Sequence, residues 1–162
     1  MMSKRYTFLV LLTFSTMISR AQGVQPKLQK IIFHSSACFG SCPKIDLQLD
    51  SNLHLYVNRQ FYKGKATPVK EYSGSFTGTI NSAEYQQLKD ILKRADYNNL
   101  NFPDVTCCDG PIKTVIIYAD GKRKYLKSMT PPAEANELIN WLTSLGVRKN
   151  LATTAENKPI EE

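Results

Sequence analysis

The stretch KIDLQLDSNLHLYV, residues 44–57, decides the fold. Its first half alternates Ile45, Leu47 and Leu49 with polar residues, which is the period of a strand with one buried face. Its second half alternates apolar residues again, and the Asp-Ser-Asn sequence between the halves is typical of a turn. The stretch therefore predicts a β-hairpin that runs from residue 44 to about residue 62.

Runs rich in β-branched, aromatic and aliphatic residues predict further strands on both sides of this hairpin. These strands are expected at 30–35, 71–80, 113–118 and 124–129, with a Gly- and Pro-containing loop at 63–70. The Asp120-Gly121 dipeptide between the last two strands is a hairpin signal.

Two segments have the apolar spacing of helices. The first is expected at 82–95, capped by Asn81 or Ser82. No Glu or Gln lies three residues after Ser82, so a capping box is not expected there. The second helix is expected to begin at Pro131-Pro132 and to stop at Gly146.

The resulting order is β-β-β-β-α-β-β-α. Consecutive strands with short turns favour antiparallel pairing, and two amphipathic helices can cover one face of a single sheet. The expected fold is an α+β two-layer sandwich with about six strands and both helices on one face. A short linker at 22–28 precedes one domain at 29–148, and the polar tail at 149–162 is expected to be disordered.

The N-terminal residues have the pattern of a secretory signal peptide. Lys4 and Arg5 precede a mostly apolar stretch at 6–17, and Ser19-Arg20-Ala21 places small residues at the cleavage positions. We expect cleavage after Ala21 and export to the periplasm or the medium, rather than an uncut membrane anchor. No later segment is apolar for long enough to span a bilayer.

The charge of the mature chain argues against a nucleic-acid partner. Removal of 1–21 leaves 18 Lys and Arg against 14 Asp and Glu, a net charge of +4. The most basic cluster, Lys122-Arg123-Lys124 with Lys127, surrounds the expected hairpin turn, where lysines usually serve as solvated edge residues. We therefore expect no nucleic-acid partner. No cofactor is expected either, and export makes an envelope protein or another extracytoplasmic ligand the expected partner.

One loop carries a family resemblance. The sequence Cys38-Phe39-Gly40-Ser41-Cys42-Pro43 follows a predicted strand, and it resembles the hallmark of an uncharacterised bacterial family catalogued as domain of unknown function 6438. The resemblance extends over residues 29–146, through 72–78, the helix at 82–95, and Asp109 and Pro111 ahead of the fifth strand. It implies an exported single domain and no particular activity. The adjacent Cys107-Cys108 pair departs from the pattern expected of the family.

The four cysteines of an exported chain this small are most simply structural disulfides. They allow three pairings: two local bridges, Cys38–Cys42 and Cys107–Cys108, or either of two cross-linked arrangements. A cross-link would close a loop of about 65 to 70 residues and stabilise more, whereas a bridge between adjacent residues is strained. The resemblance favours Cys38–Cys42, because the hallmark loop contains both residues.

Two chemical alternatives compete with the structural interpretation of the cysteines. A redox pair at Cys38 and Cys42 would need a lowered thiol pKa, but Pro43 leads into a strand instead of a helix. A zinc site would need four thiolates, and adjacent Cys107 and Cys108 side chains diverge. The lone residues His34 and His54 are interpreted as strand residues and not as metal ligands.

The sequence contains no nucleophile elbow, zinc-protease motif or phosphate loop. Tyr56, Tyr62, Tyr72 and Phe76 are expected to line one sheet face, either beneath a helix or as an open binding surface. The function we expect is a non-enzymatic binding or accessory module of the envelope or medium. The alternatives are a thiol–disulfide redox protein and a purely structural domain. The possible functional loop comprises Phe39, Gly40, Ser41, Pro43, Asp109 and Pro111.

Overall fold

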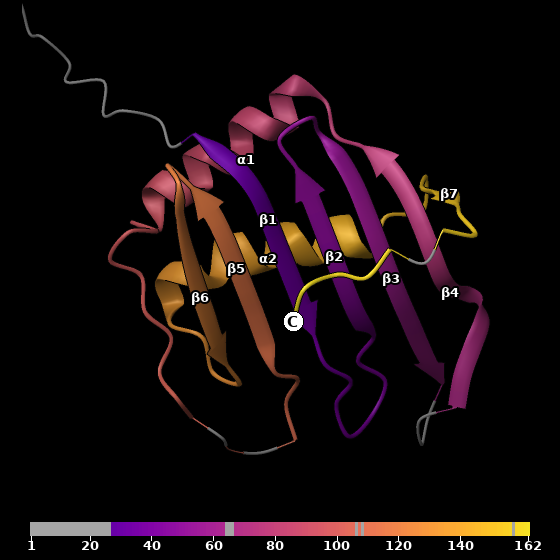
Figure 1. Ribbon diagram of the computed structural model, residues 1–162. Helices are drawn as coiled ribbons and strands as arrows, with labels where there is room; N and C mark the ends of the chain where they lie inside the picture. The colour runs from indigo at the N-terminus through magenta and orange to yellow at the C-terminus, as the bar shows by residue number, and fades with distance from the viewer. Residues whose placement is uncertain (1–26, 64–66, 106, 108, 157) are drawn as a thin grey trace, which may run out of the picture.

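The computed structural model describes residues 27–63, 67–105, 107, 109–156 and 158–162. Their strands form one antiparallel sheet in the order β6-β5-β1-β2-β3-β4-β7 (Figure 1). The strands are β1 (Leu28–Ser35), β2 (Lys44–Asp50), β3 (His54–Lys63), β4 (Thr67–Thr79), β5 (Lys113–Ala119), β6 (Lys122–Ser128) and β7 (Ala152–Thr153).

Two helices lie on one face of this sheet, α1 (Ser82–Arg94) and α2 (Asn136–Gly146), with a short 3₁₀ turn η1 (Ala133–Ala135) ahead of α2. Both pass behind the strands in Figure 1. The predicted α+β two-layer sandwich is therefore confirmed. The sheet has one strand more than expected, because β7 pairs with the outer edge of β4.

The core between sheet and helices follows from the alternation in the sequence. Ile45, Leu47 and Leu49 are buried together with Leu55 and Val57, as the hairpin pattern predicts. The same core contains Leu88, Ile91 and Leu92 of α1 and Leu138, Ile139, Leu142 and Leu145 of α2. The intervening polar residues of β2 lie on the opposite face of the sheet.

The start of α1 differs from expectation. Asn81 is the N-cap, and its side chain accepts a hydrogen bond from the backbone N–H of Glu84 at 2.9 Å. The Glu84 carboxylate accepts in return from the backbone N–H of Asn81 at 2.8 Å. These two bonds form a capping box. The sequence analysis did not predict it, because it looked for a Glu or Gln three residues after Ser82 and not three residues after Asn81.

Several boundaries also shift. The expected linker at 22–28 ends earlier, because β1 already begins at Leu28 and pairs with Ala119 there. The expected loop at 63–70 is shorter, because residues 67–69 continue the pairing of β4 with β3. Gly146 is the last residue of α2, and Asp120 and Gly121 have positive φ angles of 52° and 74° in the predicted hairpin turn.

The C-terminal tail is the largest difference. The sequence analysis expected disorder over 149–162, but in the structure residues 152–153 form β7 and residues 158–162 cross the face of the sheet opposite the helices (Figure 1). Ion pairs join Glu161 to Lys30 and Lys158 to Asp50. The ordering comes from partners more than 100 positions away in sequence, which the composition of the tail does not reveal.

The predicted signal peptide at 1–21 lies outside the described residues, and its cleavage stays a prediction. Within the part of the chain that the structure describes, no helix combines the length and apolar character that a membrane crossing requires.

Candidate functional site

A small disulfide ring closes the loop between β1 and β2. Cys38 and Cys42 are bonded, with their Cα atoms 5.4 Å apart and a sequence separation of only four. This local pairing excludes both cross-linked arrangements. Within the ring, the backbone N–H of Gly40 donates to the carbonyl oxygen of Cys38 at 2.8 Å, so the ring turns tightly.

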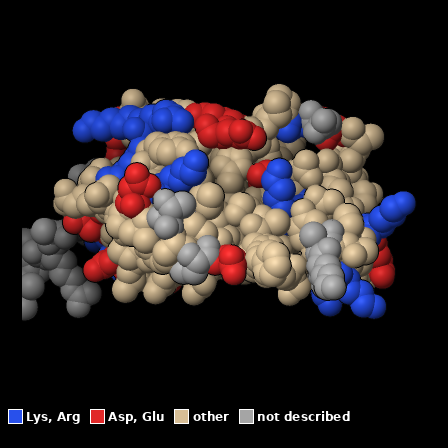
Figure 2. All heavy atoms as spheres, turned by 90° about the horizontal axis from the view of Figure 1, so that it is seen from below, with Lys and Arg blue, Asp and Glu red and all other residues tan. Residues whose placement is uncertain are grey.

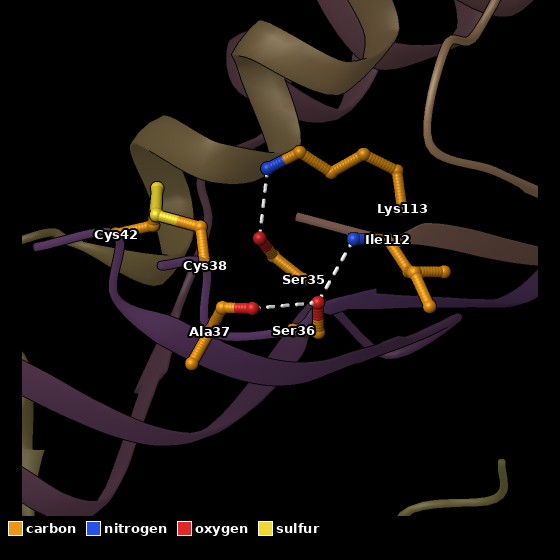
Figure 3. The surroundings of a disulfide bond; sticks show 7 residues. All are labelled: Ser35, Ser36, Ala37, Cys38, Cys42, Ile112 and Lys113. Carbon is orange, nitrogen blue, oxygen red and sulfur yellow. Dashed lines mark hydrogen bonds between the residues drawn. A yellow bond between two sulfur atoms is a disulfide. The ribbon is translucent and has the colours of Figure 1, made fainter. Parts of the chain in front are cut away.

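Ser36 fixes the base of the loop against the start of β5 (Figure 3). Its backbone N–H donates to the carbonyl oxygen of Ile112 at 3.0 Å, and its Oγ accepts from the Ile112 N–H at 2.8 Å. The same hydroxyl donates to the carbonyl oxygen of Ala37 at 3.0 Å. These three bonds hold the chain rigidly where it enters the ring.

Lys113 supports the same base from the other side. Its ammonium donates to Ser35 Oγ at 2.7 Å (Figure 3). The same ammonium lies 5.7 Å from the centroid of the Phe33 ring. Burial lowers the pKa of Lys113, because the charged ammonium loses water there. The residue therefore places a partly desolvated cation beneath the loop.

The ring presents one aromatic side chain to solvent. Phe39 is 90% exposed, and Gly40 and Ser41 beside it are exposed too. Cys42 and Pro43 are half-buried where the chain returns to the sheet. An aromatic side chain this exposed contributes nothing to the core, so packing within the domain does not explain its place on the loop.

The segment that precedes β5 lies beside the ring. The backbone N–H of Phe39 donates to the carbonyl oxygen of Asp109 at 3.4 Å, which brings the two predicted parts of the functional loop together. Asp109 is exposed and Pro111 is half-buried. Cys107 is exposed, and Cys108 lies outside the described residues, so the Cys107–Cys108 bridge stays a prediction.

A cavity of about 380 Å³ opens between this segment and the end of β6. Its lining includes Phe102, Val105, Tyr125 and Met129, with Asp104 and Lys127 as its charged members. Figure 2 looks onto this edge of the molecule, where uncharged surface predominates and the charged side chains are scattered. The aromatic and aliphatic residues that line the cavity, together with Phe39, make part of this edge of the molecule apolar.

A family comparison matches residues 29–146 to the domain of unknown function DUF6438. The chain belongs to this family. The match covers the disulfide ring, both helices and strands β1 to β6 of the DUF6438 domain. No curated protein matches the chain.

The DUF6438 domain has a second polar group near the disulfide ring, in which His34, predicted only to be a strand residue, pairs with Asp46. His34 Nδ1 lies 2.8 Å from Asp46 Oδ1, and His34 Nε2 lies 2.7 Å from the carbonyl oxygen of Glu161. Burial opposes protonation of His34, but the hydrogen bonds with Asp46 and Glu161 outweigh the effect of burial and raise the pKa of the imidazole. The pair lines a cavity of about 220 Å³ that also includes Lys44.

This pair could have been found from the strand pattern. His34 and Asp46 are polar residues of two strands that the sequence predicts, and the antiparallel register of β1 and β2 places them directly opposite each other. Both ring nitrogens have partners, as expected for a histidine with a structural role.

The four aromatic residues expected on one face are divided between the two faces. Tyr56 lies between the buried residues Leu55 and Val57 and therefore on the face opposite the helices, whereas Phe76 is buried opposite Val57 on the helix side. Tyr62 is half-buried, and its hydroxyl donates to Gln60 Oε1 at 2.9 Å. Tyr72 packs edge-on against Phe61, with ring centroids 6.2 Å apart. The residues therefore do not form one aromatic surface.

The observed disulfide also bears on the zinc alternative. Bonded sulfur atoms cannot act as thiolate ligands, so Cys38 and Cys42 are removed from the four-cysteine set. Among the described residues, no group of three or more His, Cys, Asp and Glu side chains is placed to hold a metal ion. What the site offers chemically is a rigid loop with an exposed aromatic residue beside a shallow cavity.

Proposed function

We propose that this protein is a non-enzymatic, exported binding module and that the disulfide ring is its contact loop. The observation that carries the proposal is the exposure of Phe39, 90%, on a ring closed by Cys38–Cys42. Aromatic residues supply much of the binding energy of protein interfaces, and a loop held in one conformation loses little entropy on binding.

The neighbouring surface supports the same function. Val105 is 38% exposed and Tyr125 is 43% exposed, and both line the cavity beside the ring. Apolar residues at the centre with polar residues at the rim are typical of protein interfaces. The partner we propose is accordingly a protein of the envelope or the medium, with an apolar surface that covers Phe39.

Site-specific photo-cross-linking tests this proposal. A photoreactive phenylalanine analogue is placed at position 39 in the native host, and a matched control places it at position 72, where Tyr72 is 48% exposed on β4. We expect one dominant protein adduct from position 39 that is absent from position 72. Equal adducts at both positions, or none at position 39, would contradict the proposal.

The thiol–disulfide redox alternative rests on the surface position of the ring and predicts a different result. A structural bridge in an exported protein resists reduction down to about −300 mV, whereas a catalytic bridge opens at milder potentials. Redox titration with mass spectrometric detection of Cys38 and Cys42 thiols separates the two. The purely structural alternative predicts no adduct at position 39 and a bridge that stays closed.

A further inference from the structure

A second surface, on the face of the sheet opposite the helices, is covered by the chain itself. Ile32 and Ile116 lie opposite each other on β1 and β5, and both are 0% exposed. Neither belongs to the core between sheet and helices. Gln48, the other neighbour of Ile32, is also buried. The helices therefore cannot account for the burial of this patch.

Residues 158–162 provide the cover. The side chain of Glu161 contacts Lys30, and its backbone carbonyl oxygen contacts His34. Lys30 and His34 are the positions on either side of Ile32 on this face, so residue 161 lies across Ile32. Figure 1 shows the segment passing in front of the central strands, with the C-terminus over β1.

One end of the segment places a carboxylate among three donors from three strands. Glu161 accepts from Lys30 Nζ of β1 at 3.3 Å and from Tyr118 OH of β5 at 2.7 Å. Arg123 Nε of β6 donates to the same carboxylate at 2.9 Å. An ammonium, a phenol and a guanidinium that all donate to one carboxylate form a specific pocket for an acidic side chain.

The other end places an ammonium in a complementary pocket. Lys158 Nζ lies 3.3 Å from Asp50 of β2 and 3.8 Å from the centroid of the Tyr56 ring of β3. Between the two charged ends, Ile160 is half-buried. The face thus contacts a short Lys-Pro-Ile-Glu sequence with separate pockets for its basic and acidic side chains.

Within the described residues, no backbone ladder holds this segment on the sheet; apart from the bond between His34 and the Glu161 carbonyl oxygen, its hydrogen bonds and ion pairs to the sheet are made by the side chains of Lys158 and Glu161. Residues 158–162 belong to no strand among the described elements, and their ion pairs with Lys30, Asp50 and Arg123 are partly exposed. Partly exposed ion pairs contribute little individually and are screened by salt. A competing peptide with the same pattern could therefore replace the segment.

We propose that this face is a peptide-binding site that residues 158–162 occupy in cis. Its ligand in trans is an extended protein segment with a basic residue, an apolar residue and an acidic residue at the spacing of Lys158, Ile160 and Glu161. The site is distinct from the Phe39 loop and does not depend on its role. Hydrogen bonds from Tyr118 foremost, then Arg123 and Lys30, lower the pKa of Glu161 to about 2, as expected for a carboxylate bound as the anion.

A peptide with the sequence of residues 154–162, labelled with fluorescein, tests the site by fluorescence anisotropy. The receptor is the secreted protein with Lys158→Ala and Glu161→Ala, which removes the side chains that occupy the two pockets. We expect saturable binding to this variant and binding at least about tenfold weaker to the wild type, because a tethered segment competes at an effective concentration in the millimolar range.

Two controls define specificity. A peptide with Gln in place of Glu161 should bind the opened variant more weakly, and an added Arg123→Gln substitution should weaken binding of the unaltered peptide. Equal affinity of wild type and opened variant, or no binding to the opened variant, would overturn the proposal and leave residues 158–162 as a fixed part of the fold.

A measurement on the wild type avoids any effect of substitution on folding. Excess unlabelled peptide should move the NMR chemical shifts of residues 158–162 of the isotope-labelled wild type toward those of the free peptide and leave the shifts of the buried residues of β2 unchanged. Unchanged shifts in 158–162 would count against displacement. Light scattering should give a monomer, and a dimer that dissociates on addition of the peptide would show that the segment of a second copy occupies the face instead.

Discussion

The side chain of Ile45 packs directly against the backbone of Gly146. A Cβ atom added at Gly146 would lie 2.6 Å from Cγ2 and 3.3 Å from Cδ1 of Ile45, which is fully buried in β2. This contact sets how closely the end of α2 approaches the sheet, and it positions the segment that leads to β7.

Gly146→Ala should therefore destabilise the protein, although alanine is the better helix former. Ile45 has no space to move in a closely packed core, and overpacking of this kind costs about 1–3 kcal/mol. Urea unfolding followed by circular dichroism measures the effect. Gly110→Ala is the matched control, because a Cβ there meets no atom within 4 Å. Equal stability of the two variants would contradict the contact.

Arg59 joins the same helix end to the edge of the sheet. Its Nη1 donates to the carbonyl oxygens of Gly146 at 3.0 Å and Arg148 at 2.7 Å, and its Nε donates to that of Tyr72 at 3.1 Å. Its guanidinium lies 4.1 Å from the centroid of the Phe76 ring. The residue is buried and satisfies carbonyls that α2 leaves without helical partners.

Arg59→Lys should lower the free energy of unfolding by about 1–3 kcal/mol, because an ammonium cannot reach all three carbonyls and leaves buried acceptors unpaired. Arg94→Lys is the control, since Arg94 pairs with Glu137 on the exposed surface. Chemical denaturation of both variants should show a loss for Arg59→Lys alone. A comparable loss in both would mean that the geometry of Arg59 is unimportant.

The disulfide closes a short ring, so its contribution to global stability should be modest. For a ring of this length the chain-entropy argument gives about 2 kcal/mol. Cys38→Ser with Cys42→Ser should leave the circular dichroism spectrum unchanged and lower the free energy of unfolding by about that amount. Failure of the variant to fold would show that the bridge supports the sheet and not only the loop.

Acid should release residues 158–162 from the sheet. The pKa of Glu161 is about 2 when the segment is docked and near 4.5 when it is free. Because the docked pKa is the lower one, the stabilisation by Lys30, Tyr118 and Arg123 is present above pH 4.5 and is lost as the pH falls toward 2. The NMR chemical shifts of residues 158–162 should move toward those of the free peptide over this range. Shifts that stay at their docked values down to pH 2 would contradict the prediction.

Sequence patterns predicted the sheet and the core well, because the alternation of apolar and polar residues is a property of each strand by itself. Alternation in residues 44–57 depends only on which face of a strand is buried, and the structure buries the face that the pattern indicates. The helix start was less well predicted. The Asn81–Glu84 capping box is readable in the sequence, but only when the correct first residue of the helix is known.

The tail could not be predicted from its own sequence. Residues 149–162 are polar, and polarity alone indicates disorder. Their order depends on Lys30, Tyr118 and Asp50, which come together only after the sheet has formed. The contact between Phe39 and Asp109 has the same origin, since both loops reach the same end of the sheet through the pairing of β1 with β5.

The dissociation constant of the protein that cross-links to position 39 tests the contact loop most directly. It should be measured for the wild type, Phe39→Ala and Tyr72→Ala. Loss of an aromatic anchor at the centre of an interface typically weakens binding by about tenfold or more, so we predict that loss for Phe39→Ala and an unchanged constant for Tyr72→Ala. An unchanged constant for Phe39→Ala would contradict the assignment of the disulfide ring as the contact surface.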